Sequence, residues 1–505
     1  MKQRLLIFVF ASLFHLSGMA QTITGKIVDS KTGESIPYAT ILISGKENLI
    51  SNEEGIFSIS EKNDDASVLA ISYLGYVGQQ MTISTLKQQN NVVKLQPGVF
   101  ELEDVDVNKI KPNADAVMAK VKENLKKNHS VRPEAMKKTL FMREFGTFKP
   151  KKLDIEITKS TGFSKSALKE ANADVASFTS KLMNNPPQEF TDVLANYYSG
   201  NLPGKEKPVF TNKLEVVKAT KLKDENRAVS IDNMEKMAAN IFLKHLDTTK
   251  YYRIKSGWFG SRDTISLRKD FNKKKKKKEK RTELGSAKTN LYGLLAENNV
   301  LGTQLNFANQ TDIYEYTYEG AVYSAQNEFA YVIGFKPKKS KAKYYGKLYI
   351  SEKDFAVLRA DYNLAKGKTL GGLNVKWLLG IKASENVSNG TIIYKQNASG
   401  EGYHLQYASS ETGQYFYLNR PLKFIELTKE DKDVVAVDIK VEGNMTEKVE
   451  FLNISQADIE TSVLEEVKEK EFEYIRLKRY DPKIWKDYTS IEPLEEMKQF
   501  KVVEE

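Results

Sequence analysis

The sequence contains no cysteine, only four histidines and three tryptophans in 505 residues. Without cysteine there is no disulfide framework, no thiolate metal site and no cysteine nucleophile, so the fold must be stabilised by packing. Beyond the first twenty residues, no apolar run is long enough to cross a bilayer as a helix. These absences predict a protein that is soluble or peripherally attached to a membrane.

The catalytic motifs that we tested for are also absent. No histidine is followed by glutamate three positions later, and there is no His-Glu-x-x-His sequence, so neither zinc-peptidase pattern is present. Gly367-Lys368-Thr369 lacks the glycine of a phosphate-binding loop, because Tyr362 stands five positions before Gly367. A carboxylate pair for glycoside hydrolysis stays open, since its separation depends on the folded geometry. We therefore predict no catalytic residue, no metal site and no cofactor.

The first twenty residues have the pattern of an export signal. Met1–Arg4 is basic, Leu5–Leu16 is apolar, and the small residues Gly18 and Ala20 stand where a signal peptidase reads them. We expect residues 1–20 to be a signal peptide that is cleaved before Gln21. The segment has no cysteine and so is not a lipoprotein signal.

One short stretch carries much of the positive charge. The formal net charge is +11, and eight basic residues interrupted by Glu279 form a block: Lys273, Lys274, Lys275, Lys276, Lys277, Lys278, Lys280 and Arg281. Such a block is typical of a solvated loop, and the alternative is a contact with anionic lipid or polysaccharide headgroups. No stacking aromatics interleave the lysines, so we expect no nucleic-acid partner. The block is the candidate surface-binding site.

Residues 22–95 have the pattern of short strands separated by turns. Ala39, Ile41 and Ile43 share one face, and apolar residues alternate with serine from Phe57 to Ser60. Between these runs, Thr32-Gly33 and Glu54-Gly55 suit tight reversals, because glycine adopts a positive φ without a Cβ clash. The pattern predicts a small antiparallel β-sandwich.

The same residues carry a resemblance to a known family. The order Val28-Asp29, Thr32-Gly33-Glu34, Ile36-Pro37, Glu54-Gly55-x-Phe57 and Ser72-x-x-Gly75-Tyr76 resembles the carboxypeptidase-D regulatory-like domain. The resemblance implies a transthyretin-like sandwich of seven strands over residues 21–97. It does not imply peptidase activity here, because the family's catalytic histidine motif is missing.

Beyond the sandwich, residues 98–135 form a predicted connector with one helix, from an N-cap at Asn113 to about Lys127. A strand is expected at Thr139–Phe145, and its aromatic-x-Arg143-Glu144 pattern resembles the second region of bacterial envelope proteins with the same sandwich. Alternation along a strand places Arg143 and Glu144 on opposite faces. Their expected role is structural pairing elsewhere in the domain.

Residues 136–455 are predicted to form an α+β domain. Its helices are expected at Ser164–Met183 and around 232–245, and a flexible Lys-rich loop is expected near 270–285. Residues 300–455 predict one large antiparallel meander, with a hairpin at 345–362. This region resembles the same envelope proteins and also the curved sheet of periplasmic lipoprotein carriers. Either the concave face holds a ligand, or its own helices fill it.

Residues 456–505 are predicted to be a charged C-terminal segment, helical in part between Ala457 and Arg479. Asp481-Pro482 suits an N-cap and first helical residue. Trp485 and Tyr488 are expected to anchor the terminus to the core. The fold class is thus mainly β with α+β: a transthyretin-like sandwich followed by a larger domain with a curved antiparallel sheet and a few helices.

The leading hypothesis for function is a non-enzymatic exported cell-envelope protein with a binding or scaffolding role. Its expected location is the periplasm or the outer-membrane surface of a Gram-negative bacterium, with envelope proteins, lipid or glycan as candidate partners and peripheral membrane association. The first alternative is a lipid or lipoprotein carrier that uses the concave face of the sheet. The second is a hydrolase with an unrecognised carboxylate site.

Overall fold

The computed structural model describes residues 22–100, 111–130, 134–160, 164–223, 251–256, 259–266, 282–323, 329–427 and 432–502. The chain divides into two compact units. The described part of the first unit comprises residues 22–98 and Asp481–Lys498, and the second unit extends from Val99 to Tyr480 and includes residues 499–502. The fold is mainly β, as the sequence predicts. Among the described residues, no helix combines the length and the apolar character needed to cross a bilayer.

The first unit is a sandwich of two small sheets. One sheet has the order β4-β1-β7 and the other the order β3-β2-β5-β6. A short helix, α2 (Ile83–Gln88), follows β6 and begins at the N-cap Thr82. The seven strands are β1 (Ile23–Asp29), β2 (Thr40–Ile43), β3 (Glu47–Ile50), β4 (Ile56–Ile59), β5 (Val68–Ser72), β6 (Gln79–Thr82) and β7 (Val92–Leu95).

The predicted strand faces form the core of the sandwich. Ile41, Phe57 and Leu69 are fully buried there, together with the other apolar residues of the alternating runs. Gly55 adopts φ +73°, and a Cβ at this position would lie 2.8 Å from the carbonyl oxygen of Ile27. A side chain there would therefore clash with backbone, which explains the glycine.

The C-terminal segment packs within this first unit. It contains the 3₁₀ turn η2 (Pro482–Ile484), with Asp481 as N-cap, and the short helix α10 (Glu495–Lys498). Trp485 is 7% exposed, and the amide nitrogen of Glu61 donates to the carbonyl oxygen of Lys486 at 2.8 Å. The aromatic anchor predicted from the sequence therefore packs against the N-terminal sandwich.

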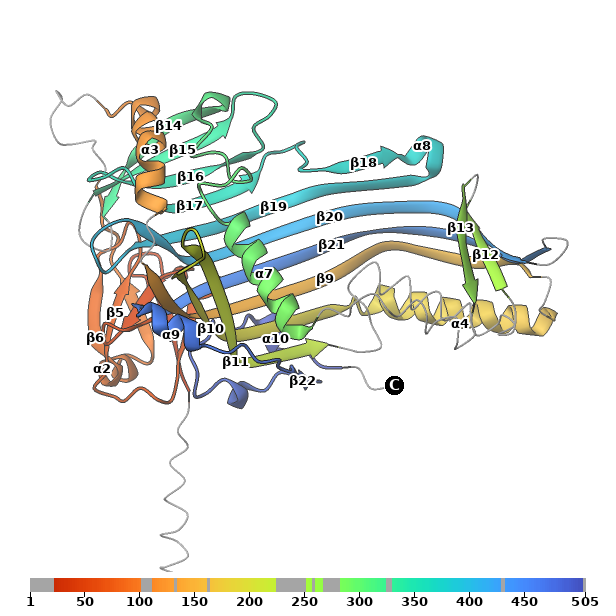
Figure 1. The fold of residues 1–505 in the computed structure, drawn as a ribbon, viewed down its shortest axis with the longest axis horizontal. Helices are drawn as coiled ribbons and strands as arrows, with labels where there is room; N and C mark the ends of the chain where they lie inside the picture. The colour runs from red at the N-terminus through yellow and green to blue at the C-terminus, as the bar shows by residue number, and fades with distance from the viewer. Residues whose placement is uncertain are drawn as a thin grey trace, which may run out of the picture. The chain divides into compact units, whose positions relative to one another are not determined.

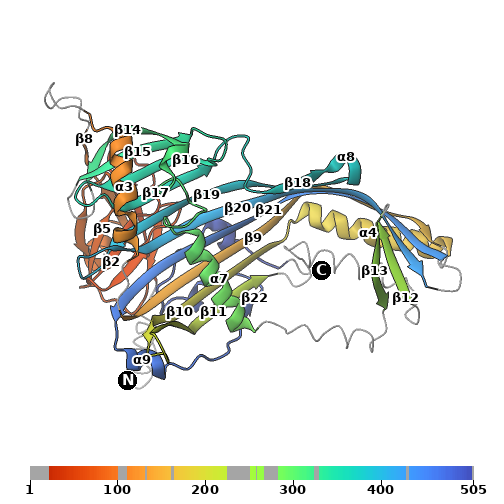
Figure 2. The ribbon, with the colours of Figure 1, turned by 45° about the horizontal axis from the view of Figure 1, so that its top comes forward.

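The second unit is built on one fifteen-stranded sheet. Its strands follow the order β22-β11-β10-β9-β21-β20-β19-β17-β16-β15-β14-β8, and β12, β13 and β18 attach beside this path. Figures 1 and 2 show the long strands β9, β19, β20 and β21 side by side, with a common curvature. The strands are β8 (Val99–Phe100), β9 (Ala135–Ser160), β10 (Gln188–Leu202), β11 (Val209–Lys223), β12 (Tyr251–Ser256), β13 (Phe259–Ser266), β14 (Tyr314–Tyr323), β15 (Phe329–Pro337), β16 (Tyr344–Ser351), β17 (Val357–Leu364), β18 (Gly372–Val375), β19 (Ile381–Gln396), β20 (Tyr403–Glu426), β21 (Lys432–Asp458) and β22 (Ile475–Leu477).

The predicted meander is present, since β14 to β17 and β19 to β21 pair with their neighbours in chain order. The structure extends this prediction in three ways. Residues 403–426 form a single long strand, β20, which bulges rather than breaks. The strand expected at 139–145 extends over 26 residues as β9. It joins the meander through β21, so the sheet also includes β10 and β11.

Five helices belong to the second unit: α3 (Ala114–His129), α4 (Lys165–Asn184), α7 (Glu283–Glu297), α8 (Lys376–Leu379) and α9 (Thr461–Glu466) among the described residues. The side chains of Asn113 and Ser164 cap α3 and α4, which confirms two predicted helices. The helix expected within 457–479 is limited to α9, after which β22 is extended. The predicted signal peptide 1–20, the helix expected around 232–245 and the block Lys273–Arg281 lie outside the described residues.

Candidate functional site

A cavity of about 790 Å³ opens between α7 and the sheet of the second unit. Its volume lies in the range typical of small-ligand sites. It is lined by hydroxyl, amide and carboxylate side chains and, to a similar extent, by apolar atoms. The lining residues are Glu144, Gly146, Thr147, Glu189, Thr191, Lys221, Lys223, Thr289, Asn290, Gly293, Leu294, Glu297, Gln304, Leu370, Glu385, Val387, Ser410, Thr412, Gly413, Gln414, Met445, Thr446, Glu447 and Val449.

Strand register builds the floor of this cavity. Residues that pair across neighbouring strands point to the same face of a sheet, so they form rows. Two adjacent rows each cross β11, β10, β9, β21 and β20 in that order. The first row is Lys221, Thr191, Glu144, Val449 and Ser410, and the second is Lys223, Glu189, Gly146, Glu447 and Thr412.

Helix α7 forms the wall above these rows. It begins at the N-cap Thr282, whose side chain accepts a hydrogen bond from the amide nitrogen of Gly285 at 3.1 Å. The buried face of α7 packs against the sheet through Leu284, Ala287, Leu291 and Leu294. This apolar stripe recurs at helical spacing, and the polar edge that flanks it, with Asn290, Gly293 and Glu297, lines the cavity.

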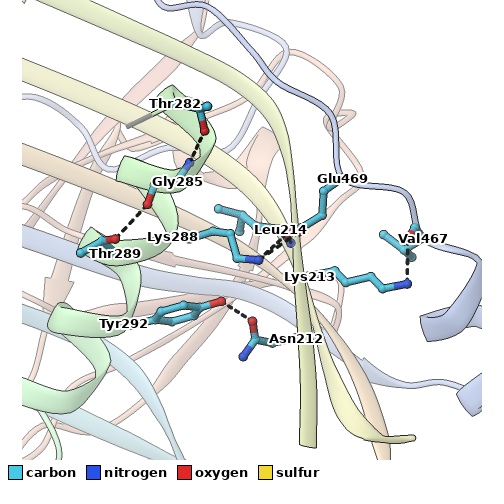
Figure 3. Close-up of polar contacts among 10 residues, drawn as sticks. All are labelled: Asn212, Lys213, Leu214, Thr282, Gly285, Lys288, Thr289, Tyr292, Val467 and Glu469. Carbon is cyan, nitrogen blue, oxygen red and sulfur yellow. Dashed lines mark hydrogen bonds and ion pairs between the residues drawn. The ribbon is translucent and has the colours of Figure 1, made fainter. Parts of the chain in front are cut away.

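Polar contacts fix α7 to the edge of the sheet (Figure 3). Lys288 pairs with Glu469 at 2.8 Å, and the same carboxylate accepts a hydrogen bond from the amide nitrogen of Leu214 on β11 at 2.8 Å. The hydroxyl of Tyr292 donates to the side-chain oxygen of Asn212 on the same strand. These contacts tie the helix, β11 and the segment before β22 into one wall.

The charges in the cavity are unevenly balanced. Glu189 forms ion pairs with Lys221 at 2.5 Å and with Lys223 at 3.3 Å, so both lysines already have a counter-ion. Glu144 accepts one hydrogen bond from the Asn290 side chain at 2.7 Å. The remaining carboxylates of the lining are therefore in excess over the cations.

Three of these carboxyl groups have a raised pKa. Partial desolvation is the main cause for Glu144, Glu297 and Glu447, because surrounding protein atoms penalise the charged form. The charge on Glu447 raises the pKa of both Glu144 and Glu297 further. A ligand that brought positive charge or hydrogen-bond donors into the cavity would relieve this repulsion.

Two glycines leave space where a side chain would otherwise project. Gly146 stands in the second row between Glu189 and Glu447. Gly293 lines the cavity from α7, and a Cβ built on it would meet no atom within 4 Å. The cavity is therefore open both at its floor and at its helical wall.

The Arg143-Glu144 pair divides between the two faces of β9, as strand alternation predicts. Glu144 faces the cavity, whereas Arg143 is 5% exposed and forms a bidentate pair with Asp192 of β10, both contacts at 2.8 Å. Asp192 holds the pKa of the arginine above its ordinary value even though burial opposes the charge. The expected structural role holds for Arg143, and Glu144 lies in the candidate site.

The described histidines lie outside the cavity and bond within the protein. His129 Nε2 accepts from the amide nitrogen of Val357 at 3.2 Å, and His404 Nδ1 contacts the side-chain oxygen of Asn397 at 2.8 Å. Burial lowers the pKa of His129 to about 4 and that of His404 to about 3. In the part of the chain that the structure describes, no cluster of three or more histidine or acidic side chains has the arrangement of a metal site.

Sequence reasoning singled out Glu144 but missed the other carboxylates and α7. The block Lys273–Lys278, Lys280 and Arg281 lies outside the described residues, so its predicted surface contact stays a prediction. The spacing of Leu284, Leu291 and Leu294 was a signal that could have indicated α7. For Glu189, Glu297 and Glu447 no local pattern was available, because only strand register and helix packing bring them together.

Comparison with solved structures yields only weak likeness. A DUF1329 family protein from Desulfovibrio piger is 9% identical, with a TM-score of 0.18, and the match covers 68% of this chain and 90% of that one. The MucA/MucB complex of Pseudomonas aeruginosa gives 8% identity and a TM-score of 0.16, over 69% of this chain and 100% of that one. A putative membrane-associated protein from Bacteroides fragilis gives 9% and 0.12, over 86% and 98%. At these TM-scores the likeness carries no argument about the fold or the function.

The family comparison concerns the N-terminal part of the chain. No curated protein matches the chain. The model of the CarboxypepD_reg-like domain matches residues 23–107, a range that includes all seven strands of the sandwich. The N-terminal sandwich is therefore a CarboxypepD_reg-like domain.

Proposed function

We propose that this chain is a non-enzymatic binding protein of the bacterial cell envelope, and that the cavity under α7 holds a glycan that carries amino groups. The observation that carries this proposal is the cavity of about 790 Å³, in which three glutamates with raised pKa face an open, hydroxyl-rich surface. The predicted signal peptide and the resemblance of the second region to envelope proteins support the location. The periplasmic or outer-membrane position is part of the proposal.

The chemistry of the lining selects the ligand class. Hydroxyl and amide side chains such as Thr412 and Gln414 suit hydrogen bonding to sugar hydroxyls, and Leu294 and Val387 can contact the apolar face of a ring. The excess carboxylates favour a protonated amine, which donates charge-assisted hydrogen bonds. An acyl chain would desolvate these charges without compensation, so the cavity does not favour the lipid-carrier alternative.

Calorimetric titration with two matched sugars tests the proposal. The probes are a glucosamine hexamer, with free amines, and the N-acetylglucosamine hexamer, with none. At pH 6.5 we expect the glucosamine hexamer to bind more tightly. Glu447→Gln should weaken that preference by about tenfold, because one charge-assisted hydrogen bond is lost. If neither sugar binds, the glycan assignment is wrong.

A substitution on α7 tests whether the cavity is the site. Gly293→Trp should fill the open space beside Gly293 and abolish sugar binding, whereas Gly293→Ala should leave it almost unchanged. Both variants change the same position, so an effect of the substitution on the helix itself would weaken sugar binding in each. Equal sugar affinity in the two variants would place the ligand elsewhere.

The hydrolase alternative retains support from one observation. Glu144, Glu297 and Glu447 lie together in an open cavity, and environments that raise carboxyl pKa values are typical of general acids. If the protein is a glycosidase, incubation with the same sugars should release new reducing ends, and Glu447→Gln should stop the release. Binding without release of reducing ends supports the binding protein instead.

A further inference from the structure

Among the described residues of the second unit, the most exposed large apolar side chains lie on a small finger of the sheet. The finger consists of β18 (Gly372–Val375) and the one-turn helix α8 (Lys376–Leu379), and β18 pairs with β19. Figure 1 shows both elements at the edge of the sheet beside the long strand β19. Trp377 is 97% exposed and Leu378 is 70% exposed, and Leu373 on β18 is 55% exposed.

The backbone of the finger is held firmly although its tip is exposed. Gly380 ends α8 with φ +66°, and its carbonyl oxygen accepts a hydrogen bond from the amide nitrogen of Asn419 at 2.8 Å. A Cβ on Gly380 would lie 2.1 Å from the carbonyl oxygen of Asn419, so only glycine permits this approach to β20. The exposure of Trp377 and Leu378 is thus a property of a built turn.

Cations surround the base of the finger. The ammonium group of Lys376 lies 3.9 Å from the centre of the Tyr417 ring. Lys382 and Lys151 lie over the Tyr415 ring at 5.3 and 5.6 Å. Alternation along β20 places both tyrosines on the face opposite Gln414, which lines the cavity. The finger therefore has an exposed apolar tip, with lysines and tyrosines at its base.

The neighbouring acidic groups do not cancel this charge. Glu442 accepts a hydrogen bond from Tyr415, and Asp154 pairs with Lys152 at 3.0 Å. Asp154 is thus neutralised by Lys152, whereas Glu442 keeps its negative charge but is outnumbered by Lys376, Lys382 and Lys151. This surface is therefore positively charged, which suits an anionic partner.

We propose that this finger inserts Trp377 and Leu378 into the headgroup layer of an anionic lipid bilayer, with Lys376, Lys382 and Lys151 against the lipid charges. Tryptophan and tyrosine concentrate at the membrane–water boundary because one part of each ring system is apolar and another part is polar. A tip of two apolar side chains reaches the acyl boundary without spanning it, as interfacial segments do. This inference does not depend on any ligand in the cavity.

Vesicle flotation with the full mature chain tests the inference. The probes are vesicles of phosphatidylcholine alone and of phosphatidylcholine with 30% phosphatidylglycerol. We expect binding to the anionic vesicles. Trp377→Ser/Leu378→Ser should weaken this binding by about tenfold or more, since it removes two apolar side chains that the bilayer would bury. Lys376→Gln/Lys382→Gln should reduce binding to anionic vesicles by about fivefold for each lysine. Trp377→Phe should retain part of the affinity.

Two controls separate the finger from other surfaces. Val217→Ser removes an apolar side chain that is 44% exposed on β11, and it should leave flotation unchanged. Gly293→Trp should also float like the unaltered chain, so a failure of the cavity proposal would not affect this test. Near-ultraviolet circular dichroism verifies that each variant is folded.

Other binding partners of the finger would give different results. If Trp377→Ser/Leu378→Ser floats as well as the unaltered chain, the inference is overturned, and the block Lys273–Arg281 becomes the candidate for vesicle contact. If sedimentation shows a vesicle-independent dimer that the double variant abolishes, the finger is a contact between copies of this chain, and the inference is likewise overturned. Loss of flotation in the double variant, with a monomer throughout, supports the bilayer.

Discussion

Single charged residues in this protein have different roles according to the face of the strand on which they lie. Arg143 and Glu144 are adjacent in β9, yet the first is buried with Asp192 and the second lines the cavity. Glu450 pairs in register with Arg143 from the other side and is 4% exposed. On the face of the sheet opposite the candidate site, the buried Arg143 is thus compensated by two acidic residues. Alternation along β9 keeps it apart from the cavity.

Removal of one partner from this buried pair should destabilise the second unit severely. Asp192→Ala leaves the Arg143 guanidinium without its bidentate acceptor, and we expect a loss of about 3–5 kcal/mol in unfolding free energy. Urea denaturation followed by circular dichroism measures it. The triple variant Arg143→Met/Asp192→Leu/Glu450→Gln removes the three buried charges together and should recover most of the loss. A single variant as stable as the original chain would show that Glu450 alone compensates the arginine.

Among the elements, α7 controls the cavity because it supplies a wall while its apolar stripe is packed on the sheet. Its polar edge carries Asn290, Gly293 and Glu297 over the floor formed by the strand rows. A glycine in the middle of a helix has a conformational cost, so its presence there is consistent with a need for open space. Gly293 therefore lowers the intrinsic stability of α7 but leaves space in the cavity.

Gly293→Ala should stabilise the protein by up to about 1 kcal/mol, because alanine has the higher helix propensity and its methyl group meets no atom within 4 Å. The midpoint of urea unfolding measures the change. Gly285→Ala is the matched comparison in the same helix, where the new Cβ would lie 3.2 Å from the hydroxyl of the N-cap Thr282. Its gain should be smaller. A destabilised Gly293→Ala variant would mean that the space beside Gly293 is not open.

At the scale of the whole molecule, the chain returns to its first unit after the large sheet is complete. Residues Asp481–Lys498 pack with the sandwich, and Asn52 Nδ2 donates to the carbonyl oxygen of Glu492 at 3.3 Å. Lys498 pairs with Glu492 at 2.9 Å within the same segment. The first unit thus combines the CarboxypepD_reg-like domain with residues some 400 positions away in the sequence.

This completion can be tested by a substitution in the returning segment. Ile491 is fully buried, and Ile491→Ala should cost about 2–5 kcal/mol in the stability of the first unit. Hydrogen exchange should become faster in β1 and β4 but stay unchanged in β20 and β21. Ile475→Ala, at a residue of β22 that is 45% exposed, is the control and should have little effect. Unchanged exchange in β1 and β4 would contradict the structural role of the segment.

Local patterns in the sequence account for the sandwich and for two helices. The alternation of Ile41 and Ile43 and the positive-φ turn at Gly55 are short-range features, since each depends on a few neighbouring residues. The caps Asn113 and Ser164 likewise depend only on the first helical turn. For this reason the sequence by itself determined the class of the first domain and the positions of α3 and α4.

The candidate site depended on tertiary structure. Glu144, Glu297 and Glu447 belong to β9, α7 and β21. They line the same cavity because β9 pairs with β21 and because α7 packs over these strands. The raised pKa of each carboxyl follows from desolvation by this packing, which no local pattern encodes. The sequence therefore determined which side chains exist, and long-range strand pairing decided which of them share a cavity.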